Sequence, residues 1–237
     1  MRFGDLIEKE KELVATGNRY GEHFQNCFDF VELTHSFVKG AKTEAWIFAL
    51  FLSQIRKHIV LSFFSVLRLH HTQAMLDLRW VFEAGAKAAY SIDFPDKANF
   101  IQVGSDGAAF EPIGLKKKAY EWLSKNYPSH SLAMIQLKKT INESVAHASV
   151  IPAFENFDMG ELVNQFKFSF FDKEDPHFIK VNLFFIGNAA KMLMHLFSAV
   201  NERRNIITFA KDFSTKLLEL ENKEHKLKAE LKGVATL

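Results

Sequence analysis

The chain has few of the residues that interrupt helices or cross-link a fold. Its 237 residues include five prolines, 11 glycines and a single cysteine, Cys27. One cysteine excludes an internal disulfide framework and a zinc site built from four thiolates. Because Cys27 falls in an apolar helical row, we expect an inert core residue and not a catalytic nucleophile. The scarcity of proline and glycine favours long helices.

Net charge is also small, at +2, so no overall field draws the protein toward nucleic acid or anionic lipid. The local basic clusters are interpreted as solvated helix faces, with phosphate sites as the alternative; they are Lys116-Lys117-Lys118, Lys138-Lys139 and Arg203-Arg204. Aromatic usage is one-sided, with 25 phenylalanines against four tyrosines and three tryptophans. Phenylalanine brings apolar area without a polar group, so this surplus predicts a large core or a subunit interface.

Signals for secretion and for membrane insertion are lacking. The first residues run directly into a charged helix without a secretory apolar region. Two apolar segments, residues 47–67 and 181–200, contain polar or charged groups that are costly in a bilayer; these are Arg56, Lys57 and His58 in the first, and Asn182, Asn188, Lys191 and His195 in the second. We therefore expect buried protein helices, a cytoplasmic location and no membrane partner.

Hydrophobic periodicity predicts an all-α fold, a multi-helix bundle with long helices that forms a single domain over residues 1–237. The only strand signal is the alternation near residues 166–171, which allows at most one short strand or β-hairpin. The predicted helices are 5–16, opened by an Asp5/Glu8 capping box, then 22–39, 46–69, 73–92, 115–126, 131–149, 178–199 and 205–232. The last helix carries an apolar seam that could dock on the bundle or on a partner subunit; it consists of Ile206, Phe209, Phe213, Leu217, Leu220, Leu227 and Leu231.

Most signatures of enzyme chemistry are missing. The loop from Gly104 to Gly107 lacks the Lys-Ser/Thr pair of a phosphate-binding loop. A di-iron helical bundle requires two Glu-x-x-His motifs, and the chain has one, from Glu32 to His35. The adjacent His70 and His71 cannot share one helix face. The sequence therefore predicts no metal and no cofactor.

One segment combines groups that suit proton transfer. His147 is expected in the last turn of the helix 131–149, with Glu143 and Ser144 near its face and an apolar stripe opposite. An imidazole on an accessible polar face exchanges protons near neutral pH. Asn142 lies five residues earlier, so Asn142 and His147 would flank a groove. The alternative is a helix-end histidine without a chemical role.

The segment Asn142-Glu143-Ser144-Val145-Ala146-His147-Ala148 resembles the signature of the HEPN superfamily. These are small helical bundles found in bacterial toxins, abortive-infection systems and CRISPR nucleases, and their motif has an arginine, a polar residue, a short spacer and a histidine. Here Asn142 stands at the arginine position. Residues 78–84 also resemble the Arg-x-x-x-Glu core helix of an HEPN-like bacterial family, through Arg79 and Glu83. The resemblance covers about residues 45–150.

The resemblance implies a homodimer with an RNA-directed role of the defence or toxin type, and a metal-independent ribonuclease activity. His147 would be the general acid–base, Asn142 and Ser144 hydrogen-bond donors, and Arg79 with Glu83 their support. Because an amide cannot supply the cation of an arginine, Arg79 or a lysine such as Lys139 must substitute, or this chain does not cleave RNA. Two alternatives stay open, which are a non-catalytic module that binds a protein partner through the C-terminal helix, and a bundle that binds an apolar ligand.

Overall fold

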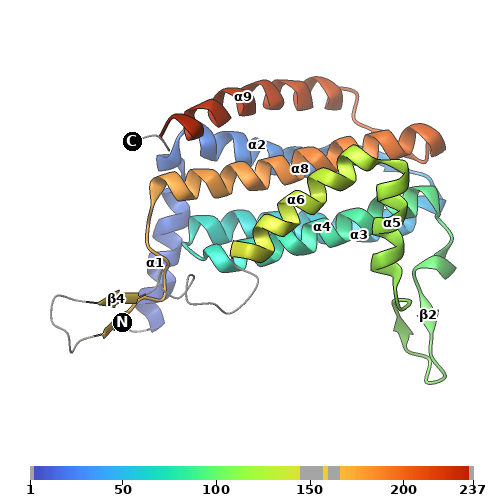
Figure 1. Ribbon diagram of the computed structural model, residues 1–237, viewed down its shortest axis with the longest axis horizontal. Helices are drawn as coiled ribbons and strands as arrows, with labels where there is room; N and C mark the ends of the chain where they lie inside the picture. Colours follow the sequence, from blue (N-terminus) through green and yellow to red (C-terminus); the bar gives the residue numbers. More distant parts are fainter. Residues whose placement is uncertain (1–2, 145–156, 160–165, 235–237) are drawn as a thin grey trace.

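A computed structural model describes residues 3–144, 157–159 and 166–234. It is a bundle of long helices with minor strand content, as Figure 1 shows, which confirms the predicted all-α class. The α-helices of the described part, in chain order, are α1 (Phe3–Ala15), α2 (Glu22–Ser36), α3 (Trp46–Leu67), α4 (His71–Asp93), α5 (Leu115–Asn126), α6 (Pro128–Ser144), α8 (Pro176–Arg204) and α9 (Phe213–Val234).

The helical hairpin of α3 and α4 forms the centre of the bundle. It turns at Leu69, whose φ of +60° is left-handed, and this confirms the predicted break near His70. Helix α4 begins at His71, two residues before the predicted start. Helix α4 packs closely on α8 at Gly85, where a Cβ atom would lie 2.4 Å from a methyl carbon of Leu193. Any larger residue at this point would require the Leu193 side chain or one of the two helices to shift.

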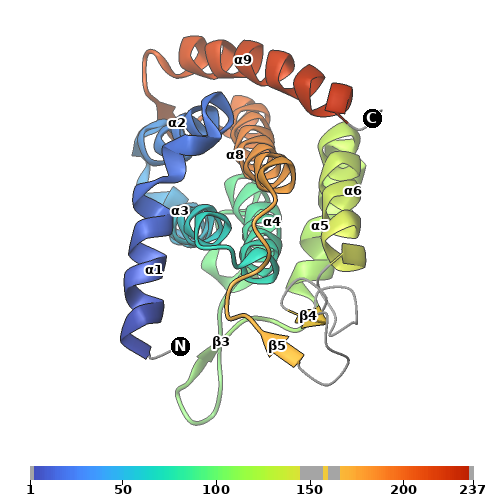
Figure 2. The same ribbon diagram turned by 90° about the vertical axis from the view of Figure 1, so that its left-hand side faces the viewer.

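The other helices surround this centre in layers. Viewed along the bundle in Figure 2, α1 and α2 lie on one side of α3, α4 and α8, while α5 and α6 lie on the other side. Helix α9 runs across the top, over α2 and α8. The predicted seam of α9 is buried there, with Phe213, Leu217, Leu220 and Leu227 each at most 7% exposed. The seam therefore docks on its own bundle, which is the first of the two alternatives that the sequence left open.

Three antiparallel strand pairs accompany the helices in the described part of the chain. The predicted strand is present as β5 (Phe166–Phe168), which pairs with β4 (Phe157–Met159). Two further pairs were not predicted: β1 (Val38–Ala41) with β6 (Ile207–Phe209), and β2 (Gln102–Val103) with β3 (Ala109–Phe110). Strands β1 and β6 occupy the end and the start of two predicted helices. Their pairing depends on a contact between distant parts of the chain, which helical periodicity cannot reveal.

Helices α1, α4, α6, α8 and α9 start at other residues than predicted. Helix α1 begins at Phe3, so Asp5 lies inside it and the predicted capping box is wrong. Helix α8 begins earlier than predicted, at Pro176, because Asp175 caps it. The Asp175 carboxylate accepts hydrogen bonds from the backbone N–H groups of His177 and Phe178, at 2.8 and 3.2 Å. This arrangement satisfies two of the donors that a helix start leaves without partners.

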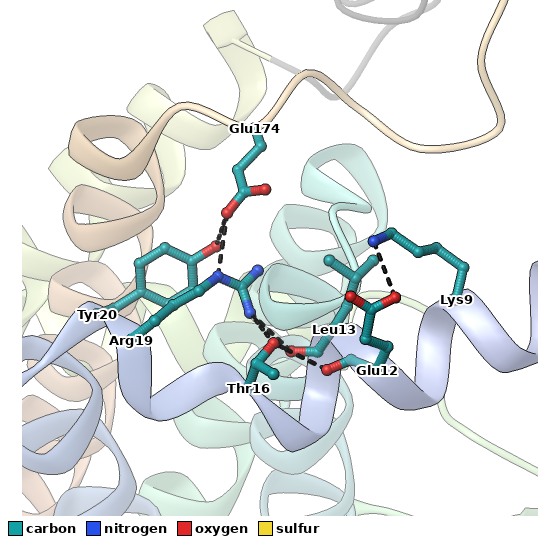
Figure 3. Close-up of polar contacts among 7 residues, drawn as sticks. All are labelled: Lys9, Glu12, Leu13, Thr16, Arg19, Tyr20 and Glu174. Carbon is teal, nitrogen blue, oxygen red and sulfur yellow. Dashed lines mark hydrogen bonds and ion pairs between the residues drawn. The ribbon is translucent and has the colours of Figure 1, made fainter.

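A polar corner fastens the turn between α1 and α2 to the segment before α8 (Figure 3). The carboxylate of Glu174 accepts hydrogen bonds from Arg19 Nε at 3.0 Å and from the Tyr20 hydroxyl at 2.9 Å. The Arg19 guanidinium also donates to the backbone carbonyl of Leu13 and lies 4.5 Å from the centre of the Tyr20 ring. Burial, aided by Glu174, raises the pKa of Tyr20 to about 12. The phenol therefore stays neutral and the corner is structural.

Two helical segments, Thr43–Leu67 and Pro176–Arg204, are long and apolar enough to cross a membrane by length and composition. Within the bundle, 39% of the most apolar stretch of the first and 61% of that of the second are buried. Core helices of globular proteins share this length and composition. The expectation that the chain has no membrane partner stays a prediction.

Candidate functional site

The structure brings together part of the site that the sequence suggests. Arg79 and Glu83 share one face of α4, where Arg79 Nε lies 3.4 Å from Glu83 Oε1. Asn142 is in the last turn of α6, followed by Glu143 and Ser144, and α6 packs on α4. His147 lies outside the described residues, as do its immediate neighbours. The α4 pair and the end of α6 are therefore placed on adjoining helices, while the predicted acid–base group is not located.

Glu83 is the centre of a cluster of cations from three helices. Its Oε1 atom lies 2.5 Å from Lys116 Nζ of α5 and 3.4 Å from Lys138 Nζ of α6, in addition to Arg79. We call Arg79, Lys116 and Lys138 the cationic cluster. The Glu83 and Lys138 side chains are only 20% and 19% exposed. Three cations around one carboxylate leave an excess of positive charge at the junction of α4, α5 and α6.

The pKa values of the cluster follow from burial and charge. Burial alone would raise the pKa of Glu83, but the ammonium groups of Lys116 and Lys138 outweigh it, so the pKa lies below its usual value. Burial lowers the pKa of Lys138, and Glu83 opposes that change. Tyr120 completes the surroundings of Lys138, whose Nζ lies 4.9 Å from the centre of the phenol ring. Glu83 thus remains a carboxylate at neutral pH and holds a partly desolvated lysine in place.

Asn142 lies one helical turn beyond Lys138. Its side-chain oxygen is buried and accepts no hydrogen bond from any of the described residues. Leaving a buried acceptor without a partner costs about 1–3 kcal/mol. Acceptors of this kind are rare in packed cores and call for a specific explanation. Asn142 therefore lies beside the cationic cluster and has a buried side-chain oxygen that could accept a hydrogen bond from a ligand.

Sequence analysis missed a second group of polar side chains, on the α3–α4 hairpin. His58 Nδ1 lies 2.7 Å from Asp77 Oδ1, and Gln73 Nε2 donates to Asp77 Oδ2 at 3.0 Å. Asp77 is 4% exposed. The indole of Trp80 lies nearly parallel to the His58 ring, with an interplanar angle of 10° and centroids 5.6 Å apart. In the sequence His58 was only a polar break in an apolar run, because its partner comes from another helix.

A groove of about 450 Å³ separates α6 from α8. Its walls mix small apolar and polar side chains, namely Ser129, His130, Ala133, Gln136, Leu137 and Thr140 of α6 with Asn188, Lys191, Met192 and His195 of α8. Two of these groups are engaged by α9, since Lys191 pairs with Glu224 and His195 pairs with Glu221. Of the features of the described residues, this groove best matches the hypothesis that the bundle binds an apolar ligand. Its basic residues Lys191 and His195 already pair with carboxylates of α9.

The described residues include Cys27 and side chains of the kinds that bind metal ions. Cys27 is 1% exposed, and burial raises the pKa of its thiol, so it is an unreactive core residue, as predicted. Within the ranges that the structure describes, no group of three or more His, Cys, Asp or Glu side chains is placed to hold a metal ion.

Comparison with family models, with curated proteins and with solved structures gives no match for this chain.

Proposed function

We propose that the chain is an HEPN-like, RNA-directed protein of the defence or toxin type, in which the cationic cluster binds RNA phosphate. The observation that carries this proposal is the convergence of Arg79, Lys116 and Lys138 on Glu83, beside the helix end that bears Asn142. Phosphate contacts supply most of the affinity of proteins for nucleic acid. An excess of positive charge held in place by one carboxylate suits that task.

The cluster also addresses the missing arginine of the HEPN-like motif. Asn142 stands where the family has a cation, and Lys138 lies one turn earlier on the same helix. Its ammonium group is partly buried, so its charge is screened less by water than that of a surface lysine. In this proposal Lys138, and not Lys139, stabilises the charge that develops on the phosphate during cleavage. His147 exchanges the proton with the ribose hydroxyl or with the leaving oxygen.

The proposal is tested by incubating purified protein with single-stranded and structured RNA in the presence of a chelator. We expect cleavage without added metal, and a His147→Ala variant that is slower by about 10²–10⁴-fold. Lys138→Gln should also lower the rate, whereas Lys117→Gln should not, because Lys117 lies 81% exposed outside the cluster. RNA that stays intact at high protein concentration would contradict the nuclease activity.

Substitutions at Asn142 probe the role of the missing cation. Asn142→Ala should lower the rate less than His147→Ala, because a neutral amide contributes hydrogen bonds but no charge. Asn142→Arg should raise the rate, since it restores a guanidinium at the position that the motif assigns to one. The measurement is the single-turnover cleavage rate, with thermal unfolding as the control for folding. A slower Asn142→Arg variant with an intact fold would argue against this alignment of the motif.

A second candidate function, a non-catalytic interaction module, is favoured by a different observation. The outer side of α3 leaves large apolar side chains exposed, with Trp46 at 41%, Leu50 at 52% and Leu61 at 37%. Apolar area of this kind is typical of contacts between proteins, and in a homodimer the same face would meet its copy. Sedimentation at micromolar concentration tests this function. A dimer that Leu50→Asp converts to a monomer supports it, and a wild-type monomer contradicts the homodimer.

A further inference from the structure

Trp80 is an exposed aromatic ring that is nevertheless held in one orientation. Its side chain is 58% exposed, and one ring face lies almost parallel to the imidazole of His58. Tryptophan brings a large apolar surface, which proteins usually bury or place at binding interfaces. An indole that is stacked on one face and exposed to this extent presents a flat surface to solvent.

The His58 imidazole that stacks on Trp80 is held in place by a hydrogen bond to Asp77. Asp77 is 4% exposed and ionised carboxylates only accept hydrogen bonds, so His58 Nδ1 donates the 2.7 Å bond between them. Gln73 donates to the other carboxylate oxygen of Asp77. These two bonds define the plane of the imidazole and, through the parallel contact, the plane of the indole. A surface that is ordered before binding loses less entropy when a flat ligand stacks on it.

Trp80 also lies beside the cationic cluster. On α4, Asp77 precedes Trp80 by three residues and Glu83 follows it by three, and residues at this spacing are neighbours on a helix surface. Trp80 is thus flanked by the His58–Asp77 pair on the side of α3 and by the Arg79–Glu83 pair on the side of the cluster. A flat aromatic surface next to positive charge matches the alternating bases and phosphates of a single nucleic-acid strand.

We propose that Trp80, stacked on His58, is the subsite on which an unpaired RNA base stacks, while Arg79 and Lys138 bind the adjoining phosphates. This inference rests on the proposed RNA-directed function and adds to it the residues that select unpaired over paired RNA. In a duplex the base faces are covered by their neighbours, so only an unpaired base can lie flat on the indole. The subsite involves no proton transfer and is independent of His147.

The experiment measures fluorescence anisotropy of a labelled oligouridylate of about 12 nucleotides, a length that spans a typical single-strand site. Uridine tracts stack weakly on themselves and leave their bases free. We expect Trp80→Ala to weaken binding by about 10-fold, and Trp80→Phe to weaken it less, because a smaller ring still stacks. Phe110→Ala is the matched control, since Phe110 is an exposed aromatic side chain, at 46%, that lies on β3 outside the cationic cluster, and it should bind as the wild type does.

The competing ligands are a blunt RNA duplex and a DNA strand of the same length. Duplex RNA should bind more weakly than the single strand. The inference is overturned if Trp80→Ala binds as the wild type does, if duplex binds as tightly, or if wild-type protein binds none of the oligonucleotides.

Trp80-dependent binding without RNA cleavage supports the subsite and contradicts the nuclease. RNA cleavage together with binding that does not depend on Trp80 supports the nuclease and contradicts the subsite. Equal, Trp80-dependent binding of DNA supports stacking and contradicts an RNA-directed role.

Discussion

Helices α9 and α6 are attached to the rest of the bundle by different interactions, α9 on α2 and α8, and α6 on α4 and α5. Helix α9 packs chiefly through its apolar seam, and it adds one-to-one contacts of the buried Glu224 with Lys191 and of Glu221 with His195. Helix α6 buries fewer apolar side chains, chiefly Met134 and Ile141. Ala133 and Leu137 pack against the core as well, and Lys138 pairs with Glu83 of α4. One layer is thus attached by hydrophobic packing, and the other in part by a half-buried cluster of charges.

The difference separates stability from recognition. Burying apolar area stabilises a fold in proportion to the area removed from water. Half-buried ion pairs contribute much less, because desolvation of the charges offsets their attraction. Apolar side chains in place of Glu83 and the cationic cluster would therefore attach α6 to α4 at least as strongly as the charges do. Three cations face Glu83, whereas one lysine faces Glu224, so only the cluster at α6 leaves an excess of positive charge for a ligand. This is why we place the candidate site on α6 and not on α9.

The largest effect is expected in the apolar contact of α9. Phe213 is 3% exposed and its ring centre lies 5.5 Å from that of Phe37 and 5.3 Å from that of Phe209. Phe213→Ala should lower the free energy of unfolding by about 3–5 kcal/mol, because it leaves a cavity among these rings. Leu218→Ala, at a side chain that is 58% exposed, should change it by less than about 0.5 kcal/mol. Urea unfolding measures both, and similar values would show that α9 is not firmly docked.

A smaller loss is expected in the charged contact of α6. Glu83→Gln removes the one carboxylate among three cations and should cost about 2 kcal/mol, below the value for a fully buried pair. The matched control is Glu121→Gln in the exposed pair with Lys117, where both side chains are more than two-thirds exposed and the change should be close to zero. Urea unfolding compares the two variants. A gain in stability for Glu83→Gln would mean that the cost of desolvating the carboxylate exceeds its attraction to the three cations.

The two layers should also respond to acid at different pH. Burial, with the charge of Lys180 next in importance, lowers the pKa of His23, which lies 3.5 Å from Glu230 of α9. The unfolded chain then takes up this proton first, so stability falls as pH drops below about 6.5. Glu83 also has a lowered pKa, despite its burial, because of Lys116 and Lys138. Its contribution persists above the ordinary glutamate value and is lost only as pH falls through the lower folded value.

Thermal unfolding between pH 8 and pH 3 should therefore show two regions of acid sensitivity. His23→Gln should reduce the first, and Glu83→Gln should reduce the second. His71 will retain part of the first in the His23 variant, because burial lowers its pKa as well. If His23→Gln leaves the profile between pH 8 and pH 5 unchanged, His23 does not couple α9 to pH.

Much of the fold follows from sequence periodicity, because helices are local structures. The predicted bounds of α5, Leu115–Asn126, agree with the structure at both ends, and the kink near His70 was recognised from its polar residues. The β1–β6 pair was not, since it joins residues some 170 positions apart, as in Val38 with Phe209. Strands this short have no periodicity of their own, and their pairing depends on how α2 and α8 pack.

The same distinction applies to the candidate site. The contact between Arg79 and Glu83 was predictable, because residues four apart on a helix are neighbours. The contacts of Lys116 and Lys138 with Glu83 could not be predicted, since they depend on the packing of α5 and α6 against α4. His58 and Asp77 likewise come from two helices whose register the sequence does not reveal.

The smallest effect, and the one that tests the cluster most directly, is expected from Arg79→Ala. If Arg79 were the sole partner of Glu83, its loss would leave a half-buried charge unpaired and would lower stability markedly. In the structure Lys116 and Lys138 remain beside Glu83, and the Arg79 side chain is 37% exposed. We therefore expect a loss below about 1 kcal/mol, in the range of partly exposed helix pairs. A double-mutant cycle with Glu83→Gln, followed by urea unfolding, isolates the coupling between the two side chains. A coupling above about 2 kcal/mol would mean that the lysines do not share the charge of Glu83. In that case Arg79 would be the principal partner of Glu83, and Lys138 would be free to bind phosphate without it.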